Sequence, residues 1–112
     1  MELRSSAFEN GGKIPARYTC DGENAVPPIS ISQVPDGAKA LALIIDDPDV
    51  PISLRPDGNF DHWLVWNIPP DVSEIIDGKI DGAAYGINTR GDNKYTGPCT
   101  PDREHRYFFK LY

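Results

Sequence analysis

Basic residues are scarce in this 112-residue chain, which has 11 lysines and arginines against 17 aspartates and glutamates. The formal net charge at pH 7 is -6. Nucleic acids and anionic membrane surfaces carry negative charge, so proteins bind them through clustered lysine and arginine side chains. The shortage of basic residues therefore argues against both kinds of partner.

Long apolar runs are missing as well. No stretch approaches the roughly 20 apolar residues that span a bilayer, and the N-terminus lacks the apolar core of a signal peptide. We therefore expect a cytoplasmic protein without a transmembrane segment. The length suits a single domain over residues 1–112, since domains usually have about 50 to 250 residues.

Cysteine and the common catalytic signatures are also rare or absent. The two cysteines, Cys20 and Cys99, form no CxxC pair, which argues against a zinc site and a dense disulfide framework and leaves open a single bridge. The sequence contains no GxGxxG or Walker loop, HExxH motif, GxSxG elbow or EF-hand spacing. We expect a protein that is not an enzyme and holds no cofactor.

Ten glycines and eleven prolines separate short apolar runs, a pattern typical of strands joined by tight turns. No segment shows a sustained helical period, so we predict an all-β fold. The central strands are predicted at residues 40–45, 62–68 and 105–112, weaker strands at 28–32 and 7–9, a surface loop at 51–61, and either a helical turn or an edge strand at 72–76.

Period-2 alternation makes His105 and Tyr107 neighbours on one face of the last predicted strand, with Arg106 on the other face. Aromatic residues inside strands usually belong to the core rather than to a ligand platform. The residues assigned to the core for this reason are Trp63, Trp66, Phe108, Phe109 and Tyr112.

The only two histidines, His62 and His105, each open an apolar strand directly after a loop. A rigid sheet often presents polar side chains to a cleft at such a position. The alternative is that each histidine only caps a strand edge through a hydrogen bond. Asp46, Asp47 and Asp49 could likewise be ordinary Asx-turn residues ahead of proline.

A second alternative is a metal-dependent enzyme. Two histidines and one carboxylate suffice for a facial metal triad with open positions, and His62, His105 and Asp47 could supply them. No sequence spacing supports this arrangement.

Short motifs occur in a fixed order along nearly the whole chain. They are Ile14-Pro15, Tyr18-Thr19-Cys20-Asp21-Gly22 with Asn24, Pro27-Pro28, Asp47-Pro48-Asp49-Val50-Pro51, His62-Trp63, Asn67-Ile68-Pro69, Gly86-Ile87-Asn88, Tyr95-Thr96-Gly97-Pro98-Cys99, Pro101 and His105-Arg106-Tyr107. Together they resemble the phosphatidylethanolamine-binding protein family, especially its bacterial and archaeal Raf-kinase-inhibitor-like branch.

The resemblance implies a β-sandwich with a shallow cavity that binds phosphate-like anions and phospholipid headgroups. Histidine and tyrosine would donate hydrogen bonds to phosphate oxygens, and Asp47 would pair with an ethanolamine ammonium. We expect tighter anion binding as the pH falls through about 6.5, where imidazole gains its proton. The ligand-binding residues implied by position are Asp47, Asp49, Pro51, His62, Gly97, Pro98, Pro101, His105 and Tyr107.

The resemblance also implies a regulatory role toward a protein partner, a kinase or a protease. An alternative is a protease inhibitor that acts through the exposed loop at residues 51–61. Two departures from the family stand near the last motif, because Thr100 replaces a usual proline and residues 102–104 replace a glycine-rich approach.

Family members continue for a few dozen residues past the last predicted strand, and their additional helix and strand are absent here. We therefore expect a C-terminally shortened domain. A second copy or a complementary chain would then cover the open sheet.

Overall fold

The computed structural model describes residues 1–50, 53, 55–56, 58–99 and 105–112, which form two antiparallel sheets. Within this part of the chain the regular elements are strands and one 3-10 turn, which confirms the predicted all-β class. In chain order they are β1 (Glu2–Arg4), η1 (Ala16–Tyr18), β2 (Ile29–Ser32), β3 (Leu41–Asp47), β4 (Phe60–Ile68), β5 (Glu74–Ile75), β6 (Ala84–Tyr85) and β7 (Phe108–Leu111).

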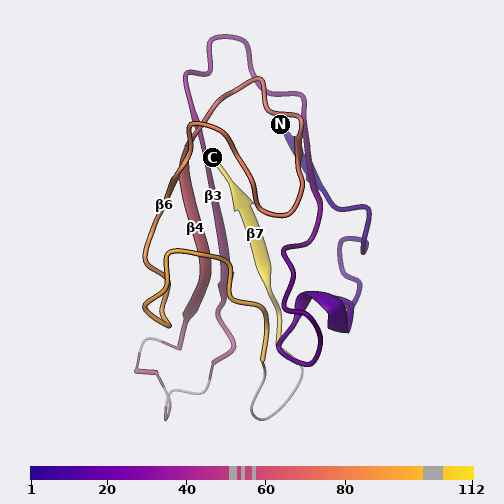
Figure 1. Ribbon diagram of the computed structural model, residues 1–112, viewed down its shortest axis with the longest axis vertical. Coiled ribbons are helices and arrows are strands. Elements are labelled where there is room, and N and C mark those ends of the chain that lie inside the picture. The colour runs from indigo at the N-terminus through magenta and orange to yellow at the C-terminus, as the bar shows by residue number, and fades with distance from the viewer. Residues whose placement is uncertain (51–52, 54, 57, 100–104) are drawn as a thin grey trace.

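The two sheets form the layers of a sandwich. The smaller sheet has the strand order β1-β2-β5, and the larger has the order β6-β4-β3-β7. Figure 1 shows β6, β4, β3 and β7 side by side, with the C-terminal strand β7 in yellow next to β3. The long strands β3 and β4 therefore form the centre of the larger sheet.

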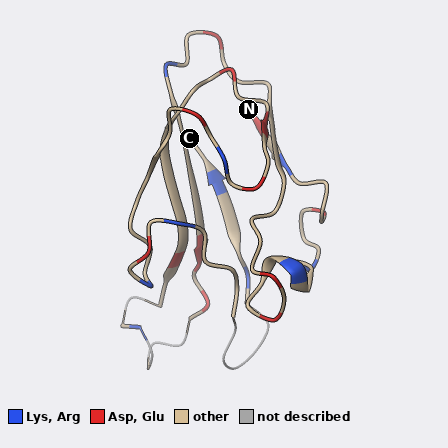
Figure 2. Cartoon of the chain, viewed as in Figure 1, with Lys and Arg blue, Asp and Glu red and all other residues tan. Residues whose placement is uncertain are grey.

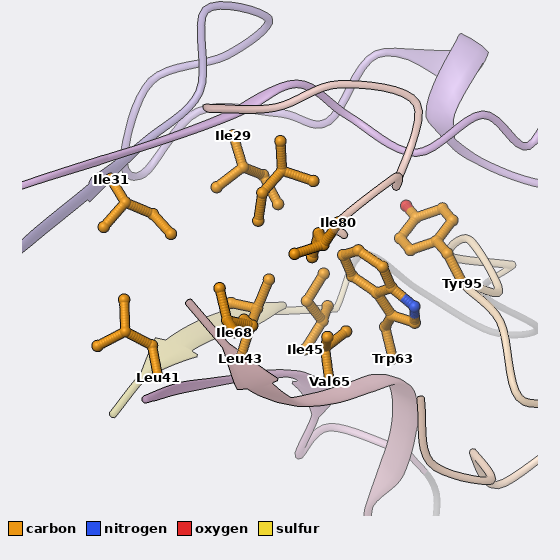
Figure 3. Close-up of a cluster of buried hydrophobic side chains, with 11 residues drawn as sticks. Ile29, Ile31, Leu41, Leu43, Ile45, Trp63, Val65, Ile68, Ile80 and Tyr95 are labelled. Atoms are coloured by element: carbon orange, nitrogen blue, oxygen red, sulfur yellow. The ribbon is translucent and has the colours of Figure 1, made fainter. Parts of the chain in front are cut away.

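The hydrophobic core lies between the layers. Ile29 and Ile31 alternate with exposed serines on β2 and point toward the larger sheet, where Leu41, Leu43 and Ile68 lie across from them (Figure 3). Fully burying a side chain of this size contributes about 1.5–3 kcal/mol. The remaining core residues are Leu41, Ile45, Trp63, Ile68, Ile75, Ile80 and Tyr95.

A β-bulge in β4 decides where His62 points. Ile45 pairs with Trp63, but the next residue, Asp46, pairs with Asp61, so His62 is an extra residue on β4. A bulge of this kind redirects a side chain that strict alternation would place on the other face. As a result, His62 and Trp63 are both buried although they are consecutive.

A second irregularity lies at the far end of β4. Leu43 pairs with Val65 while Leu41 pairs with Ile68, and Asn67 has a positive φ of 57°. The extra residue leaves both Trp66 and Asn67 exposed and returns Ile68 to the core.

The prediction that all five strand aromatics lie in the core is wrong for three of them. Trp63 is buried and Phe109 packs against the core. Trp66, Phe108 and Tyr112 are 49%, 41% and 62% exposed, respectively. The reason for Phe108 is alternation, since Phe109 faces inward on the same short strand.

The structure changes several predicted strand boundaries. The weak strand at residues 7–9 is wrong, because these residues have no strand structure and β1 lies earlier. The last strand begins at Phe108 rather than at residue 105, and β4 begins at Phe60 inside the predicted loop. Residues 28–32 contain β2, and residues 72–76 contain β5 at an edge of the smaller sheet.

Candidate functional site

Asp47 and His105 form a buried pair at one end of the larger sheet. The Nδ1 atom of His105 lies 2.6 Å from Oδ2 of Asp47, and the two side chains are 1% and 5% exposed. A carboxylate beside Nδ1 favours a hydrogen on that nitrogen and fixes the orientation of the ring. The other oxygen, Oδ1, accepts a hydrogen bond of 2.8 Å from the Asp49 backbone N–H.

This second hydrogen bond confirms the Asx-turn interpretation for Asp47. One carboxylate therefore shapes the loop after β3 and holds His105 at the same time. The structure gives Asp47 a positioning role, and its pairing with an ammonium group stays a prediction.

Asp49 binds the residue that follows His105. Its carboxylate accepts hydrogen bonds of 2.7 Å from the Arg106 backbone N–H and of 2.9 and 2.8 Å from Nε and Nη2 of the guanidinium. These hydrogen bonds raise the pKa of Arg106 above its ordinary value. Asp47 and Asp49 thus attach the loop after β3 to two consecutive residues at the entrance to β7.

Thr96 and Asn88 hold His62 in place through hydrogen bonds. Its Nδ1 atom lies 2.6 Å from the carbonyl oxygen of Thr96, and the Thr96 N–H donates back to the His62 carbonyl over 3.0 Å. The amide of Asn88 donates to the His62 carbonyl and to Oγ1 of Thr96. Because a backbone carbonyl can only accept, Nδ1 of His62 carries the hydrogen.

The other ring nitrogen of His62, Nε2, is buried and has no hydrogen-bond partner within the described residues. Burial lowers the pKa of His62, and this effect outweighs the hydrogen bond to Thr96 and the nearby carboxylates of Asp47, Asp61 and Asp46, which raise it. His62 is therefore a neutral imidazole near pH 7.

The lowered pKa of His62 predicts a loss of stability in acid. The unfolded state binds the proton more readily, so the contribution of His62 is complete above about pH 6.5 and declines as the pH falls from 6.5 toward the lowered pKa. Urea unfolding at pH 7.5 and 5.5 should show a larger stability loss for the wild type than for His62→Asn. An equal loss in both proteins would contradict this assignment.

The ring of Tyr107 lies close to the rings of both histidines. Its ring centre lies 5.5 Å from that of His62 and 6.5 Å from that of His105. Phe60 covers His62 at a ring distance of 4.8 Å. Residues far apart in the sequence thus bring two imidazoles and one phenol to a single buried place, next to the acidic ends of β3 and β4 (Figure 2).

An open cavity of about 920 Å³ borders this cluster. It lies between the N-terminal segment and the entrance to β7, and its lining includes His105, Tyr107 and Pro98 but not Asp47, Asp49, His62 or Gly97. Tyr107 lines the cavity and its ring contacts the His62 ring, so His62 lies one side chain away from the cavity lining. Two of the four central residues, His105 and Tyr107, thus line a cavity, and the shallow pocket around all four stays a prediction.

The other expected ligand-binding residues have different surroundings. Gly97 donates its N–H to Oδ1 of Asn24 over 2.8 Å, and a Cβ at this position would come within 2.4 Å of the Tyr18 carbonyl oxygen. Gly97 thus permits close packing of two loops. Pro51 and Pro101 lie outside the described residues.

A disulfide stabilises the same loop contact. Cys20 and Cys99 are bonded, and the Cys20 N–H donates to the Pro98 carbonyl over 3.0 Å. The Tyr95 hydroxyl donates to the Tyr18 carbonyl over 2.8 Å. The bridge that the sequence left open therefore joins the segment after η1 to the segment that carries Thr96.

Sequence reasoning did not assign a function to Thr96, Asn88 or Arg106. Thr96 acts through a backbone carbonyl, which has no sequence signature, whereas the position of Arg106 next to His105 was a usable signal.

Among the described residues no group of three or more His, Cys, Asp or Glu side chains is placed to hold a metal ion. The described part of the chain also has no helix long and apolar enough to cross a membrane.

The fold and this cluster define a small β-sandwich protein with a buried histidine–carboxylate site. The family model described as phosphatidylethanolamine-binding protein matches residues 4–112. The chain belongs to the phosphatidylethanolamine-binding protein family, as its motifs indicate. UPF0098 proteins of Chlamydia muridarum and of Methanothermobacter thermautotrophicus are both 48% identical over 112 and 118 residues, and the match covers all of this chain and 75% of each relative.

Two solved structures share the fold. The crystal structure of a phosphatidylethanolamine-binding protein homologue from Chlamydia trachomatis has a TM-score of 0.94 and 49% sequence identity, over 98% of this chain and 72% of that one. YbcL of Escherichia coli, described as a new member of the mammalian family, has a TM-score of 0.86 and 30% identity, over 99% and 74% of the two chains.

Proposed function

We propose that this protein is a binding module for phosphate-like anions, free or as phospholipid headgroups, and that it regulates a protein partner without catalysing a reaction. The observation that supports this most is the convergence of His62, His105 and Tyr107 at one buried place beside a cavity. The name of the family supports the choice of a phospholipid headgroup.

The chemistry of the cluster suits an anion. A phenol donates one hydrogen bond, an imidazole donates through any nitrogen that carries a hydrogen, and phosphate oxygens accept such bonds. Asp47 orients the His105 ring, which reduces the loss of side-chain freedom on binding.

The charges around the cavity give it access to an anion despite the negative net charge. Arg4, Lys13 and Arg106 line the cavity together with Glu9 and Asp21. Arg4 and Arg106 also pair with Glu2 and Asp49, so three basic side chains stand against four acidic ones and the entrance is closer to neutral than the molecule as a whole.

The proposal predicts that Tyr107→Phe weakens the binding of phosphoethanolamine. The variant keeps the ring between the two histidines and removes only the hydroxyl group. A hydrogen bond to a charged group contributes about 1.5–3 kcal/mol, so we expect the dissociation constant to rise roughly ten- to a hundredfold. Isothermal titration calorimetry at pH 6 measures this change.

Tyr85→Phe is a matched control. The Tyr85 hydroxyl donates to the Gly78 carbonyl and accepts from the Ile80 N–H, beside β6 rather than beside the histidines. This variant should bind phosphoethanolamine with unchanged affinity. If neither phosphate nor phosphoethanolamine binds the wild type at millimolar concentration, or if Tyr107→Phe binds as tightly as the wild type, the proposed site is wrong.

A further inference from the structure

The His62 ring presents an acceptor, not a donor, to any ligand that reaches it. Its Nδ1 hydrogen is used by the Thr96 carbonyl at 2.6 Å. In a neutral imidazole the second nitrogen then has no hydrogen and can only accept. His62 is 5% exposed, and Nε2 has no hydrogen-bond partner in the described ranges, so no group there supplies a hydrogen to it.

The groups packed around His62 explain why it stays neutral. From β4 the Phe60 ring excludes water on one side, and from the entrance to β7 the Tyr107 ring does so on another. The carboxylates of Asp46 and Asp47 on β3 and of Asp61 on β4 favour a positive ring.

Each of these carboxylates already has another partner. Asp47 accepts from His105, Asp46 pairs with Lys110 at 2.9 Å, and Asp61 accepts from Asn59 at 2.9 Å. The positive charge of Lys110 offsets that of the Asp46 carboxylate, and burial has the largest effect on the pKa of His62.

An anion that approaches a neutral His62 brings a second acceptor to Nε2. Two lone pairs repel each other, and a hydrogen between them removes the conflict. That hydrogen can come from the ligand, as the P–OH of a phosphomonoester, or from the solvent, which makes the ring an imidazolium.

We propose that the site binds an anion together with one proton, which lies between Nε2 of His62 and a ligand oxygen. This inference rests on the proposed function and specifies its ligand. The ligand class is an anion that either carries an acidic hydrogen, such as a phosphomonoester, or binds with uptake of a proton, such as the phosphodiester of an intact phospholipid headgroup.

Proton counting by calorimetry tests the inference on the wild-type protein. Phosphoethanolamine, glycerophosphoethanolamine and sulfate are titrated at pH 7.5 in two buffers of different ionisation enthalpy. We expect uptake of about one proton for each anion and an affinity that falls about tenfold per pH unit above pH 7. Sulfate is similar in size to the phosphate group of phosphoethanolamine but carries no hydrogen near neutral pH, so a comparison of the two separates the effect of a ligand hydrogen from the effect of size.

A phosphomonoester and a phosphodiester should differ in proton uptake at pH 6. A phosphomonoester has its second pKa near 6 and is about half protonated there, so its proton uptake should fall to about one half. Glycerophosphoethanolamine is a diester without this hydrogen, so every proton it binds with must come from the solvent or already be on His62. The ratio of the affinities for glycerophosphoethanolamine and phosphoethanolamine therefore shows whether the site prefers a phosphodiester or a phosphomonoester.

Nitrogen-15 spectra of the imidazoles give an independent readout. The chain has two histidines, and His62→Gln leaves one, so both rings are assigned directly. We expect ligand-free His62 at pH 7.5 to carry its hydrogen on Nδ1 and none on Nε2, and the Nε2 signal to shift on anion binding.

Two variants sharpen the assignment. His62→Gln places an amide near the position of Nε2, where an N–H can donate at any pH, and should bind sulfate without proton uptake. His62→Asn places its amide near Nδ1 and retains a donor for Thr96. If His62→Gln does not fold, the wild-type proton count and spectra still decide the question.

Two results would overturn the inference and leave the proposed function intact. They are anion binding with no proton uptake and no pH dependence between pH 5.5 and 8, and a hydrogen on Nε2 of ligand-free His62 at pH 7.5. The absence of binding by all three anions would instead refute the proposed function as well.

Discussion

Reduction of the Cys20–Cys99 disulfide should lower the free energy of unfolding by about 4 kcal/mol. The bonded cysteines are 79 residues apart, and a bridge that closes a long loop removes much conformational entropy from the unfolded chain. Total stabilities of small domains are about 5–15 kcal/mol, so the reduced protein should be marginally stable. Urea unfolding followed by tryptophan fluorescence, with and without a reducing agent, measures the difference.

The same reduction should weaken anion binding before the protein unfolds. Thr96, whose carbonyl fixes His62, lies three residues before Cys99, and the bridge holds this segment against the loop after η1. The double variant Cys20→Ala/Cys99→Ala is the control, since a reducing agent should not change its stability. A destabilisation below about 1 kcal/mol would show that the hydrogen bonds of Tyr95 and Gly97 suffice to hold the loops.

The bridge also bears on where the protein acts. Disulfides persist in oxidising compartments and are rare in the cytosol. The cytoplasmic location expected from the sequence stays a prediction, and measurement of the redox state of Cys20 and Cys99 in cells would test it.

The central strands were predictable because their composition and their alternation of inward and outward residues both indicate a strand. The run Leu41 to Ile45 is apolar and ends in two β-branched isoleucines, and alternation assigns Leu43 and Ile45 to the core face of β3. The strands β1, β5 and β6 have two or three residues each, too few to display a period. Their positions depend on pairing with distant strands, which a single sequence does not reveal.

The site was predictable in its residues but not in its geometry. Motif resemblance named His62, His105, Tyr107 and Asp47, and the structure brings these four together. Strict alternation would place His62 on the face opposite Trp63, together with Leu64. Only the bulge in β4, set by pairing with β3, turns His62 inward, and a bulge of this kind has no signature in this sequence.

The sequence also could not show whether His62 donates or accepts a hydrogen bond toward a ligand. The sequence suggests that histidines donate to a phosphate, but the tautomer of His62 depends on the Thr96 carbonyl. The expectation of tighter binding at low pH therefore stays a prediction. In the ligand-free protein His62 gains its proton at a lower pH than an ordinary imidazole does, because burial lowers its pKa.

Asp47→Ala should destabilise the protein by about 3 kcal/mol and also weaken anion binding. The substitution removes the acceptor of the buried Nδ1–H of His105 and of the partly buried N–H of Asp49. Each unsatisfied donor costs about 1–3 kcal/mol, and removal of one member of a buried pair costs about 3–5 kcal/mol. Asp92→Ala is the control, because Asp92 forms an exposed ion pair with Arg90 and should contribute less than about 0.5 kcal/mol.

Asp47→Asn separates the charge of this side chain from its shape. The amide oxygen can still accept one of the two hydrogen bonds, so the loss of stability should be smaller than that of Asp47→Ala. A double-mutant cycle with His105→Ala isolates the pair, and we expect a coupling free energy of about 1–3 kcal/mol, as for contacting residues in one network. A coupling near zero would mean that Asp47 stabilises the loop after β3 alone and that His105 is oriented by other contacts. Anion affinity in Asp47→Asn would then match the wild type, whereas a positioning role for Asp47 requires it to fall.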